Sequence, residues 1–310
     1  MKLVLETIEP ETDLVRVFGF RAEAGQQLPV YAPGAHLQFD LGPLGTRAYS
    51  LIDWPEPNSL LSVAVQREDE GEGGSRAMHE LSLGQTISAS EPKNDFPLVA
   101  QAPHVLLLAG GIGITPLISM ATQLAAERRS FEIHYSARTS SRMGFAEKLK
   151  AAFDLAANFY FDDTAPLDLT ALMSAQPSGT HVYICGPKGM IDAARAAAVT
   201  AGVAEDAIHV ELFSSPESQT GDGAFEVEVH GTGQVVTVAP DQTIVEALEE
   251  AGVDVMYDCQ RGDCGICQTD VISGTPDHRD VVLSDAEKAS GKVMQICVSR
   301  AKSTRLVLDI

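Results

Sequence analysis

Apolar and polar positions follow different patterns in successive parts of the chain. Over residues 1–100, apolar and polar residues alternate in short stretches, such as 14–18 and 60–65, between turns rich in Gly and Pro. Side chains of a strand point alternately to its two faces, so this pattern is typical of strands that bury one face. The segment therefore predicts an antiparallel barrel or sandwich.

From about residue 101 the pattern changes to strands and helices in alternation. Continuous apolar runs at 104–109, 131–135 and 181–185 are typical of strands that are buried on both faces of a parallel sheet. Residues 117–128 and 190–200 have the spacing of helices. This alternation predicts an α/β domain with a parallel sheet.

The polar segment 214–223 (SSPESQTGDG) is predicted to be a linker. After it, residues 225–229 and 235–238 predict a hairpin, and residues 243–251 predict a short helix before a cysteine-rich loop. A chain of 310 residues is long enough for two or three cores. We therefore expect three domains, at residues 1–100, 101–213 and 224–310.

Composition and charge limit the classes of function. The chain is 45% hydrophobic and 21% charged, which is ordinary for a globular protein. No apolar run approaches the roughly 18 residues that span a bilayer, and Glu6 and Glu9 interrupt the N-terminal segment too early for a signal peptide. We therefore expect a cytoplasmic protein that does not bind membranes.

The formal net charge of -21 repels phosphate backbones and argues against nucleic-acid binding. Such acidity is typical either of attraction to a basic protein partner or of solubility alone. The five cysteines are an odd number, which argues against a framework of disulfides and favours metal binding or reactivity.

Four of the cysteines have the spacing of metal ligands. Cys259, Cys264 and Cys267 are separated by four and by two residues, and Cys297 follows after 29 more. This spacing matches the ligands of a plant-type [2Fe-2S] cluster, in which three thiolates come from one tight loop and the fourth from elsewhere. Gly262 and Gly265 let the loop backbone curl around the inorganic sulfides, so that backbone N–H groups can hydrogen-bond to them. A four-cysteine zinc site is the alternative, although such sites usually combine two CxxC pairs.

A glycine-rich turn, Gly110-Gly111-Ile112-Gly113, follows the predicted strand 104–109. Thr115 is then expected to cap a helix and Pro116 to be its first residue. Glycines allow the backbone to approach a pyrophosphate, which a helix N-terminus favours. The spacing differs from the dinucleotide fingerprint G-x-G-x-x-G, so a tight structural turn is an alternative.

A second turn, Cys185-Gly186-Pro187, follows the predicted strand 181–184 and again precedes a helix. Two glycine turns at the carboxyl ends of parallel strands mark the edge where α/β sheets bind ligands. For Cys185 the alternative is a small buried apolar residue.

The barrel segment contains two further short motifs. Arg47-Ala48-Tyr49-Ser50 lies on a predicted strand, and Gly73-Gly74-Ser75 lies in a glycine-rich loop. With the downstream motifs they form the ordered set RAYS, GGS, GGIGITP, CGP and C-x4-C-x2-C…C. This set resembles the ferredoxin–NAD(P) reductase superfamily and, within it, the phthalate dioxygenase reductase and vanillate demethylase reductase family. Residues 90–98, 180–193 and 283–290 are also similar to carnitine monooxygenase reductase components.

The resemblance covers essentially the whole chain and implies a fold and a function. The expected fold is an antiparallel flavin-binding β-barrel, a parallel-sheet nucleotide-binding α/β domain and an α+β β-grasp ferredoxin domain. The expected function is that of a monomeric reductase component in a two-component Rieske-type oxygenase or demethylase system. It would pass electrons from NADH through FMN and the [2Fe-2S] cluster to a terminal oxygenase.

The resemblance also implies site residues. The FMN contacts would be Arg47, Tyr49, Ser50, Gly73, Gly74, Ser75, Thr115 and Phe213. The NADH contacts would be Gly110, Gly111, Gly113, Cys185, Gly186 and Pro187. Within these sets, Ser50 near the reacting flavin nitrogen and Cys185 near the nicotinamide would have positioning roles.

Three charged groups of residues affect these expectations. Glu72 stands where family members often have a basic residue, so Arg47 or Arg76 has to supply the charge that balances the phosphate. Arg138 and Arg142 would suit NADPH and the nearby Asp162 and Asp163 would not, and the family resemblance favours NADH. Four acidic residues near the cysteines form a candidate docking face, namely Asp254, Asp258, Asp263 and Asp270.

Two other functions are compatible with the sequence. One is a free-standing NADH diaphorase or ferric reductase. The other is a redox sensor, which would need an output module beyond the three carriers that already occupy the chain.

Overall fold

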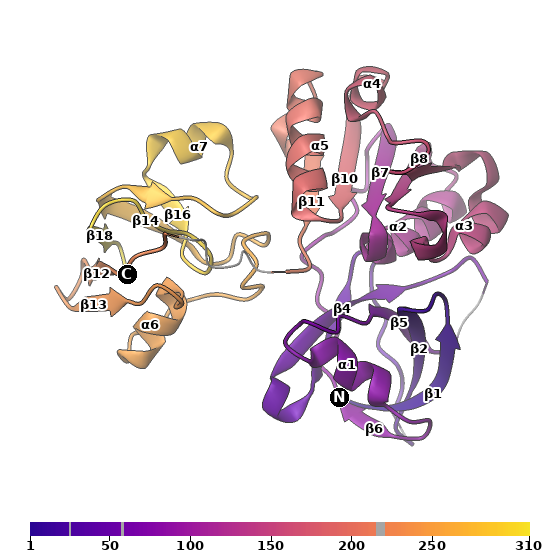
Figure 1. The fold of residues 1–310 in the computed structure, drawn as a ribbon, viewed down its shortest axis with the longest axis horizontal. Coiled ribbons are helices and arrows are strands. Elements are labelled where there is room, and N and C mark those ends of the chain that lie inside the picture. The colour runs from indigo at the N-terminus through magenta and orange to yellow at the C-terminus, as the bar shows by residue number, and fades with distance from the viewer. Residues whose placement is uncertain (25, 57–58, 215–220) are drawn as a thin grey trace. The chain divides into compact units, whose positions relative to one another are not determined.

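The computed structural model describes residues 1–24, 26–56, 59–214 and 221–310. The chain divides into two compact units, Met1–Glu211 and Leu212–Ile310 (Figure 1). Both domains predicted within residues 1–213 lie almost wholly in the first unit, and the boundary between them stays a prediction. Residues 215–220, the middle of the predicted linker, lie outside the described ranges.

A six-stranded antiparallel sheet opens the first unit, in the order β3-β4-β5-β2-β1-β6. Phe39 of β3 bridges to Ala89 and His36 bridges to Lys93, so the edge of the sheet at β3 meets the segment after β6. The sheet therefore nearly closes, which confirms the predicted barrel. Its strands are β1 (Lys2–Pro10), β2 (Val15–Ala22), β3 (His36–Asp40), β4 (Thr46–Ile52), β5 (Leu61–Gln66) and β6 (Thr86–Ser88), and α1 (Gly74–Glu80) lies between β5 and β6.

Strand β5 is buried on both faces, and this joins the barrel to the next sheet. Val63 belongs to the barrel core, whereas Ala64 belongs to a second core that also contains Leu117 and Tyr135. Because successive side chains of a strand point to opposite faces, one strand contributes to two cores. The barrel and the α/β segment therefore form one compact unit.

The second sheet of this unit is parallel throughout, in the order β11-β10-β7-β8-β9. The order of the strands reverses between β7 and β10, which is the point where open α/β sheets bind ligands. This confirms the predicted parallel sheet. Its strands are β7 (His104–Gly110), β8 (Phe131–Ala137), β9 (Ala157–Phe161), β10 (Thr180–Cys185) and β11 (Ile208–Glu211).

Helices cover both faces of the parallel sheet (Figure 1). They are α2 (Ile114–Ala126), α3 (Ala146–Phe153), α4 (Leu169–Ser174) and α5 (Lys188–Thr200). The predicted start of α2 was wrong, because the N-cap is Gly113 and not Thr115, and Pro116 is the third helical residue. A 3-10 turn at Gly111–Gly113 runs directly into the helix and replaces a side-chain cap. Proline is tolerated there because N–H groups of the first helical turn have no intrahelical partner.

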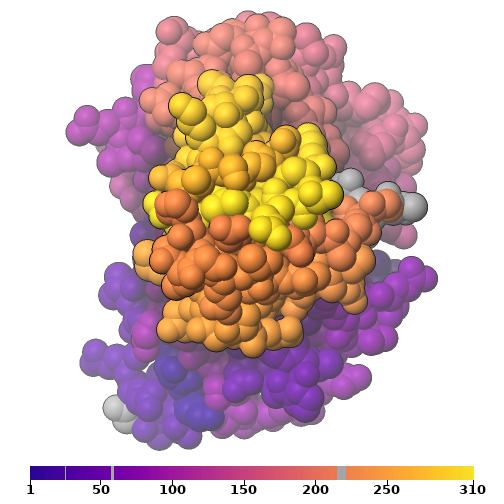
Figure 2. All heavy atoms as spheres, turned by 90° about the vertical axis from the view of Figure 1, so that its left-hand side faces the viewer, coloured from indigo at the N-terminus to yellow at the C-terminus, as the bar shows by residue number. Residues whose placement is uncertain are grey.

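The second unit contains a five-stranded sheet in the order β13-β12-β18-β14-β16. Figure 2 shows the orange residues from the start of this unit against the yellow residues of its end, as the parallel pairing of β12 with β18 requires. The predicted hairpin is β12 with β13. The elements are β12 (Phe225–Val229), β13 (Val235–Val238), α6 (Ile244–Glu250), β14 (Gln268–Ser273), β15 (Pro276–Asp277), α7 (Asp285–Ser290), β16 (Val293–Gln295), β17 (Arg300–Ala301) and β18 (Arg305–Leu308).

Both helices of the second unit begin with a capping box. Thr243 and Glu246 cap α6, and Ser284 and Glu287 cap α7, each with reciprocal hydrogen bonds between side chain and backbone. Ile244 and Leu248 of α6 are fully buried in the core of this unit. The helix therefore fixes one end of the cysteine-rich loop that follows it.

Candidate functional site

The four spaced cysteines come together in the second unit. Three lie on the loop between α6 and β14, and Cys297 follows β16. The thiol of Cys259 makes contact with those of Cys264 and Cys297, and Cys267 makes contact with Cys297. Cys267 and Cys297 are buried, whereas Cys259 and Cys264 are partly exposed. The loop and the segment after β16 thus form one group of four sulfur atoms.

The contacts between the thiols perturb their ionisation. Contact with Cys264 and Cys297 lowers the pKa of Cys259, and the same contacts raise the pKa of both partners. A bound metal favours the thiolate form of every ligand, because only thiolates coordinate it.

The loop backbone is shaped for close approach. Gly262 and Gly265 have φ angles of 81° and 79°, which favour glycine. A Cβ atom at Gly262 would lie 2.6 Å from a methyl group of Val298, so a side chain does not fit there. The Arg261 N–H donates a hydrogen bond of 3.3 Å to the Cys259 sulfur. The expected hydrogen bonds from loop N–H groups to the inorganic sulfides stay a prediction.

The residues present fit a [2Fe-2S] cluster. Each iron of such a cluster takes two cysteine thiolates, and sulfide ions complete its coordination. No three His, Cys, Asp or Glu side chains among the described residues are arranged to hold a single metal ion. A binuclear cluster does not require three protein ligands around one metal ion, because its four thiolates are divided between two irons.

Asp263 lies inside the cysteine loop and does not belong to a docking face. Its side chain is only 3% exposed, lies 3.5 Å from Arg261 and accepts a hydrogen bond of 2.9 Å from the Leu212 N–H. Burial raises its pKa to about 7. The sequence-based expectation that this carboxylate faces a partner was wrong, because it ties the first residue of the unit to the loop. Asp254 and Asp270 are exposed.

In the first unit, the two glycine turns touch each other at the reversal of strand order. A Cβ atom at Gly113 would lie 2.3 Å from the Cys185 carbonyl oxygen, and one at Gly186 would lie 3.0 Å from the Gly110 backbone. A Cβ atom at Gly110 would lie 2.7 Å from Pro187. Packing between the two turns therefore accounts for the glycines at 110, 113 and 186.

Gly111 is a different case. Its φ of 56° favours glycine, but a Cβ atom there would meet nothing within 4 Å. Cys185 is fully buried at the end of β10, in register with Ala109 and Glu211. The two turns thus bring every residue of the predicted NADH set to one edge of the sheet.

Arg47 meets the glycine-rich loop of the barrel. A Cβ atom at Gly74 would lie 2.7 Å from Cγ of Arg47, so the glycine makes room for the arginine. The Ser75 hydroxyl accepts a hydrogen bond of 3.0 Å from the Glu68 N–H. Burial raises the pKa of Tyr49 to about 12, and the charge of Arg47 beside it acts in the opposite direction. The structure therefore brings Arg47, Tyr49 and the loop together.

Glu72 pairs directly with Arg47. Nη2 of Arg47 donates to Oε2 of Glu72 at 2.6 Å, with side chains that are 31% and 84% exposed. Arg76 donates to the Asp69 carbonyl oxygen at 2.9 Å. A phosphate group at this loop would therefore share Arg47 with Glu72.

The end of β4 lies beside the first turns of α2. Ser119, one turn after Thr115, donates to the Leu51 carbonyl oxygen at 2.7 Å and accepts from the Asp53 N–H at 2.8 Å. These bonds bring Thr115 and Ser50, which are both buried, into the same region of the unit. The sequence-based prediction did not include Ser119. Its position one helical turn after Thr115 was the only signal for it.

Phe213 is 40% exposed and belongs to the second unit. Its expected contact with the flavin stays a prediction. Arg138 and Asp162 follow paired strands, and the Asp162 N–H donates to the Ala137 carbonyl oxygen at 3.2 Å. Both charges thus lie at the edge of the sheet where the glycine turns lie.

Two family profiles match the chain. The 2Fe-2S iron-sulfur cluster binding domain matches residues 227–302. The N-terminal domain of the dimethylamine monooxygenase subunit DmmA-like family matches residues 86–208. The first match covers all four spaced cysteines, and the second covers both glycine turns.

Relatives resemble the chain over nearly its whole length. Vanillate O-demethylase oxidoreductase of Pseudomonas sp. strain HR199 is 43% identical over 304 residues, 96% of each chain. The carnitine monooxygenase reductase subunit of Acinetobacter pittii is 40% identical and covers 98% of this chain and 100% of its own. Tetrachlorobenzoquinone reductase of Sphingobium chlorophenolicum is 38% identical, over 96% and 94%.

The solved structure of phthalate dioxygenase reductase superposes with a TM-score of 0.73 at 33% identity, and the match covers 100% of this chain and 98% of that one. That protein is described as a modular structure for electron transfer from pyridine nucleotides to [2Fe-2S]. The fold and sites thus define an NAD(H)-dependent oxidoreductase that carries a flavin and a [2Fe-2S] cluster. The chain belongs to the family of oxygenase reductase components that includes phthalate dioxygenase reductase and vanillate O-demethylase oxidoreductase.

No helix among the described residues has the length and apolar character that crossing a bilayer requires.

Proposed function

We propose that this protein is the reductase of a two-component Rieske-type oxygenase or demethylase, which delivers electrons from NADH through FMN and the [2Fe-2S] cluster to a terminal oxygenase. The observation that carries the proposal is the presence, in one chain, of glycine turns at the reversal of strand order and of four grouped thiols. When bound, a flavin accepts two electrons from NADH and releases them singly, as a [2Fe-2S] cluster requires.

The flavin would be held mainly by the barrel. Arg47 supplies positive charge for the phosphate, and Gly73, Gly74 and Ser75 supply a loop without bulky side chains. The buried hydroxyl of Ser50 is proposed to hydrogen-bond to the reacting edge of the ring. We propose FMN, which the family resemblance implies; Arg47 and Arg76 both lie at this loop and would balance its one phosphate.

NADH would bind where the two glycine turns meet. Gly111 leaves space on its outer side, and Cys185 and Pro187 border the same edge. We propose NADH as the donor in place of NADPH. Arg138 and Asp162 lie at this edge with opposite charges, and the family resemblance favours NADH. The carboxylate of Asp162 would repel a 2′-phosphate and would accept hydrogen bonds from a free ribose hydroxyl. An Asp162→Asn variant should oxidise NADPH relatively better than the unchanged protein does.

The cluster would be held by Cys259, Cys264, Cys267 and Cys297. The partly exposed pair, Cys259 and Cys264, gives electrons a short route to the surface. Exposed carboxylates nearby favour a partner with a basic docking surface. We further propose that the protein works in the cytoplasm, where its five cysteines stay reduced, and as a monomer, which light scattering would check.

The decisive experiment is reconstitution with a terminal oxygenase encoded beside this chain. The purified reductase should support NADH-dependent turnover of the oxygenase, and rising salt should slow this transfer. A Cys264→Ser variant should lose oxygenase turnover while it keeps NADH-dependent ferricyanide reduction by the flavin. Equal oxygenase turnover by that variant would contradict the proposed route.

A second candidate is reduction of a small acceptor such as a quinone. The relative named tetrachlorobenzoquinone reductase, with its 38% identity, favours testing it. Quinone reduction that continues unchanged in the Cys264→Ser variant, together with no turnover of any partnered oxygenase, would favour this second function.

A further inference from the structure

A short segment covers one side of the cysteine loop. Residues 280–283, here called the cover segment, lie between β15 and α7. The Val281 N–H donates to the Gly262 carbonyl oxygen at 3.0 Å, and a methyl group of Val282 lies 3.4 Å from the position of a Cβ atom at Gly265. The cover segment therefore contacts both glycines of the loop that carries three of the proposed cluster ligands.

Asp280, at the start of the cover segment, buries its carboxylate completely, with 0% of the side chain exposed. Oδ2 of this carboxylate accepts a hydrogen bond of 2.9 Å from the Leu283 N–H. Its Cα lies 3.1 Å from the position of a Cβ atom at Gly262. The residue that carries this buried carboxylate thus packs directly against the cysteine loop.

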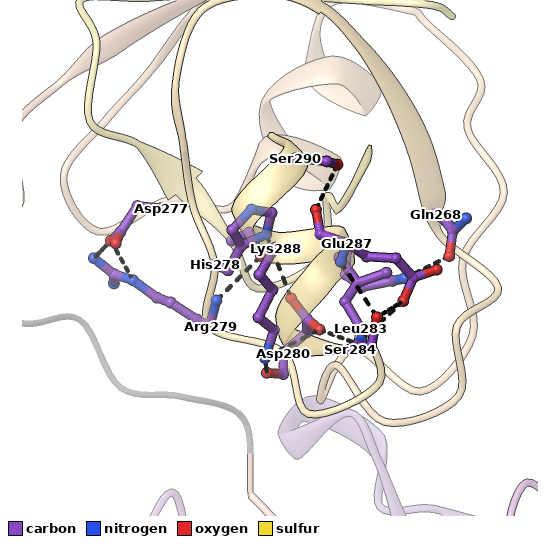
Figure 3. A network of polar contacts seen from close by, with 12 residues as sticks. Gln268, Asp277, His278, Arg279, Asp280, Leu283, Ser284, Glu287, Lys288 and Ser290 are labelled. Atoms are coloured by element: carbon purple, nitrogen blue, oxygen red, sulfur yellow. Dashed lines mark hydrogen bonds and ion pairs between the residues drawn. The ribbon is translucent and has the colours of Figure 1, made fainter. Parts of the chain in front are cut away.

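Lys288 compensates this charge from α7 (Figure 3). Its ammonium group donates to the Asp280 carbonyl oxygen at 2.7 Å and lies 3.8 Å from the carboxylate. His278 lies 3.8 Å from the other carboxylate oxygen, and burial lowers the pKa of this histidine, which favours its neutral form. Lys288 is therefore the main positive charge that faces Asp280.

A neutral side chain would accept the Leu283 hydrogen bond equally well. A buried carboxylate is costly unless a positive charge compensates it, so bonding alone does not account for this pair. Charges in a poorly solvated region act strongly on their neighbours. Reduction adds one negative charge to a cluster, and nearby charges and hydrogen bonds tune its potential.

We propose that Asp280 and Lys288 are positioning residues for the cluster: they hold the cover segment on the cysteine loop, and their opposite charges set the reduction potential of the cluster. The inference rests on the proposed ligand set. It does not depend on the identity of the electron acceptor.

The test is a redox titration of the intact protein, followed by the electron paramagnetic resonance signal of the reduced cluster. Asp280→Asn should shift the midpoint potential upward, because a negative charge is removed. Lys288→Gln should shift it downward, and the double variant should return toward the unchanged protein. Asp285→Asn, which removes an exposed carboxylate from the same helix as Lys288, is the matched control and should shift the potential least.

Shifts of the two single variants in the same direction, or a control shift as large as that of Asp280→Asn, would overturn the proposal. If Asp280→Asn fails to hold the cluster, Lys288→Gln decides alone: a lower potential supports the proposal and an unchanged one overturns it. Failure of the proposed function is distinguishable, since it would appear as absent oxygenase turnover in a protein with a normal cluster signal.

Discussion

Removing the charge of Glu72 should strengthen flavin binding. In the structure Glu72 holds Arg47 at 2.6 Å, and this arginine is the group proposed to meet the flavin phosphate. A Glu72→Gln substitution frees Arg47 and also removes a negative charge from the phosphate loop. The opposite change, Arg47→Ala, removes the countercharge itself.

The exposure of the pair limits the gain. With Arg47 31% exposed and Glu72 84% exposed, water screens their attraction, and such pairs contribute up to about 1 kcal/mol. Glu72→Gln should therefore lower the Kd of FMN by up to about fivefold. Arg47→Ala loses a hydrogen bond between charged groups, about 1.5–3 kcal/mol, and should raise the Kd by roughly 10- to 150-fold.

The assay is quenching of flavin fluorescence as FMN is titrated with apoprotein at low and high salt. The gain from Glu72→Gln should shrink as salt rises, because screening already weakens the pair. Glu70→Gln removes the same charge from the same exposed loop and serves as the control. An unchanged or weaker affinity in Glu72→Gln, or an equal gain in the control, would refute the competition between Glu72 and the phosphate.

Three further predictions concern the cluster, the glycine turns and acid stability. Cys264→Ser should lose most of its iron, about two atoms per chain, while acid-released flavin stays at the level of the unchanged protein. Gly113→Ala should destabilise the first unit by about 1–3 kcal/mol in urea unfolding, because its Cβ would lie 2.3 Å from a carbonyl oxygen. Gly189→Ala, with nothing within 4 Å, should raise stability by up to about 1 kcal/mol. Burial lowers the pKa of His209 to about 4, so the unfolded chain binds the proton more readily between pH 6.5 and 4. The free energy of unfolding should therefore fall as pH drops through this window, by less than about 3 kcal/mol because the ring is partly solvated. His209→Gln should flatten that fall, whereas the control His230→Gln, at an exposed histidine, should not.

Periodicity and spacing predicted the order of domains and the four thiols. The hairpin of the second unit and the helix after it occupy nearly the expected residues, because alternation at 225–229 and the cap at Thr243 are local signals. The predicted start of α2 was wrong, because the same glycine-rich sequence is compatible with a 3-10 turn and with the first turn of a helix. Local sequence does not show which of the two the backbone adopts.

The sequence alone did not predict contacts between residues that are far apart in the chain. Asp263 has the same side chain as the exposed Asp270, and only the folded loop shows that it is buried against Arg261. Nothing in the sequence around Asp280 indicates that its carboxylate is buried. Its burial becomes apparent only when the cover segment is seen on Gly262.

The glycine motif illustrates how a functional interpretation has to be separated from a structural one. The glycines at 110 and 113 of the first turn and at 186 of the second are required by contact between the two turns. This contact would exist without any ligand. Gly111 is the exception, since its outer side is open. The argument for a nucleotide therefore rests on where the turns lie, at the reversal of strand order between β7 and β10, more than on the number of glycines. Gly111→Ala leaves the contact between the turns intact and costs only the strain of a positive φ, about 1–2 kcal/mol. Weaker NADH binding by this variant, in protein that is still folded, would separate the two roles.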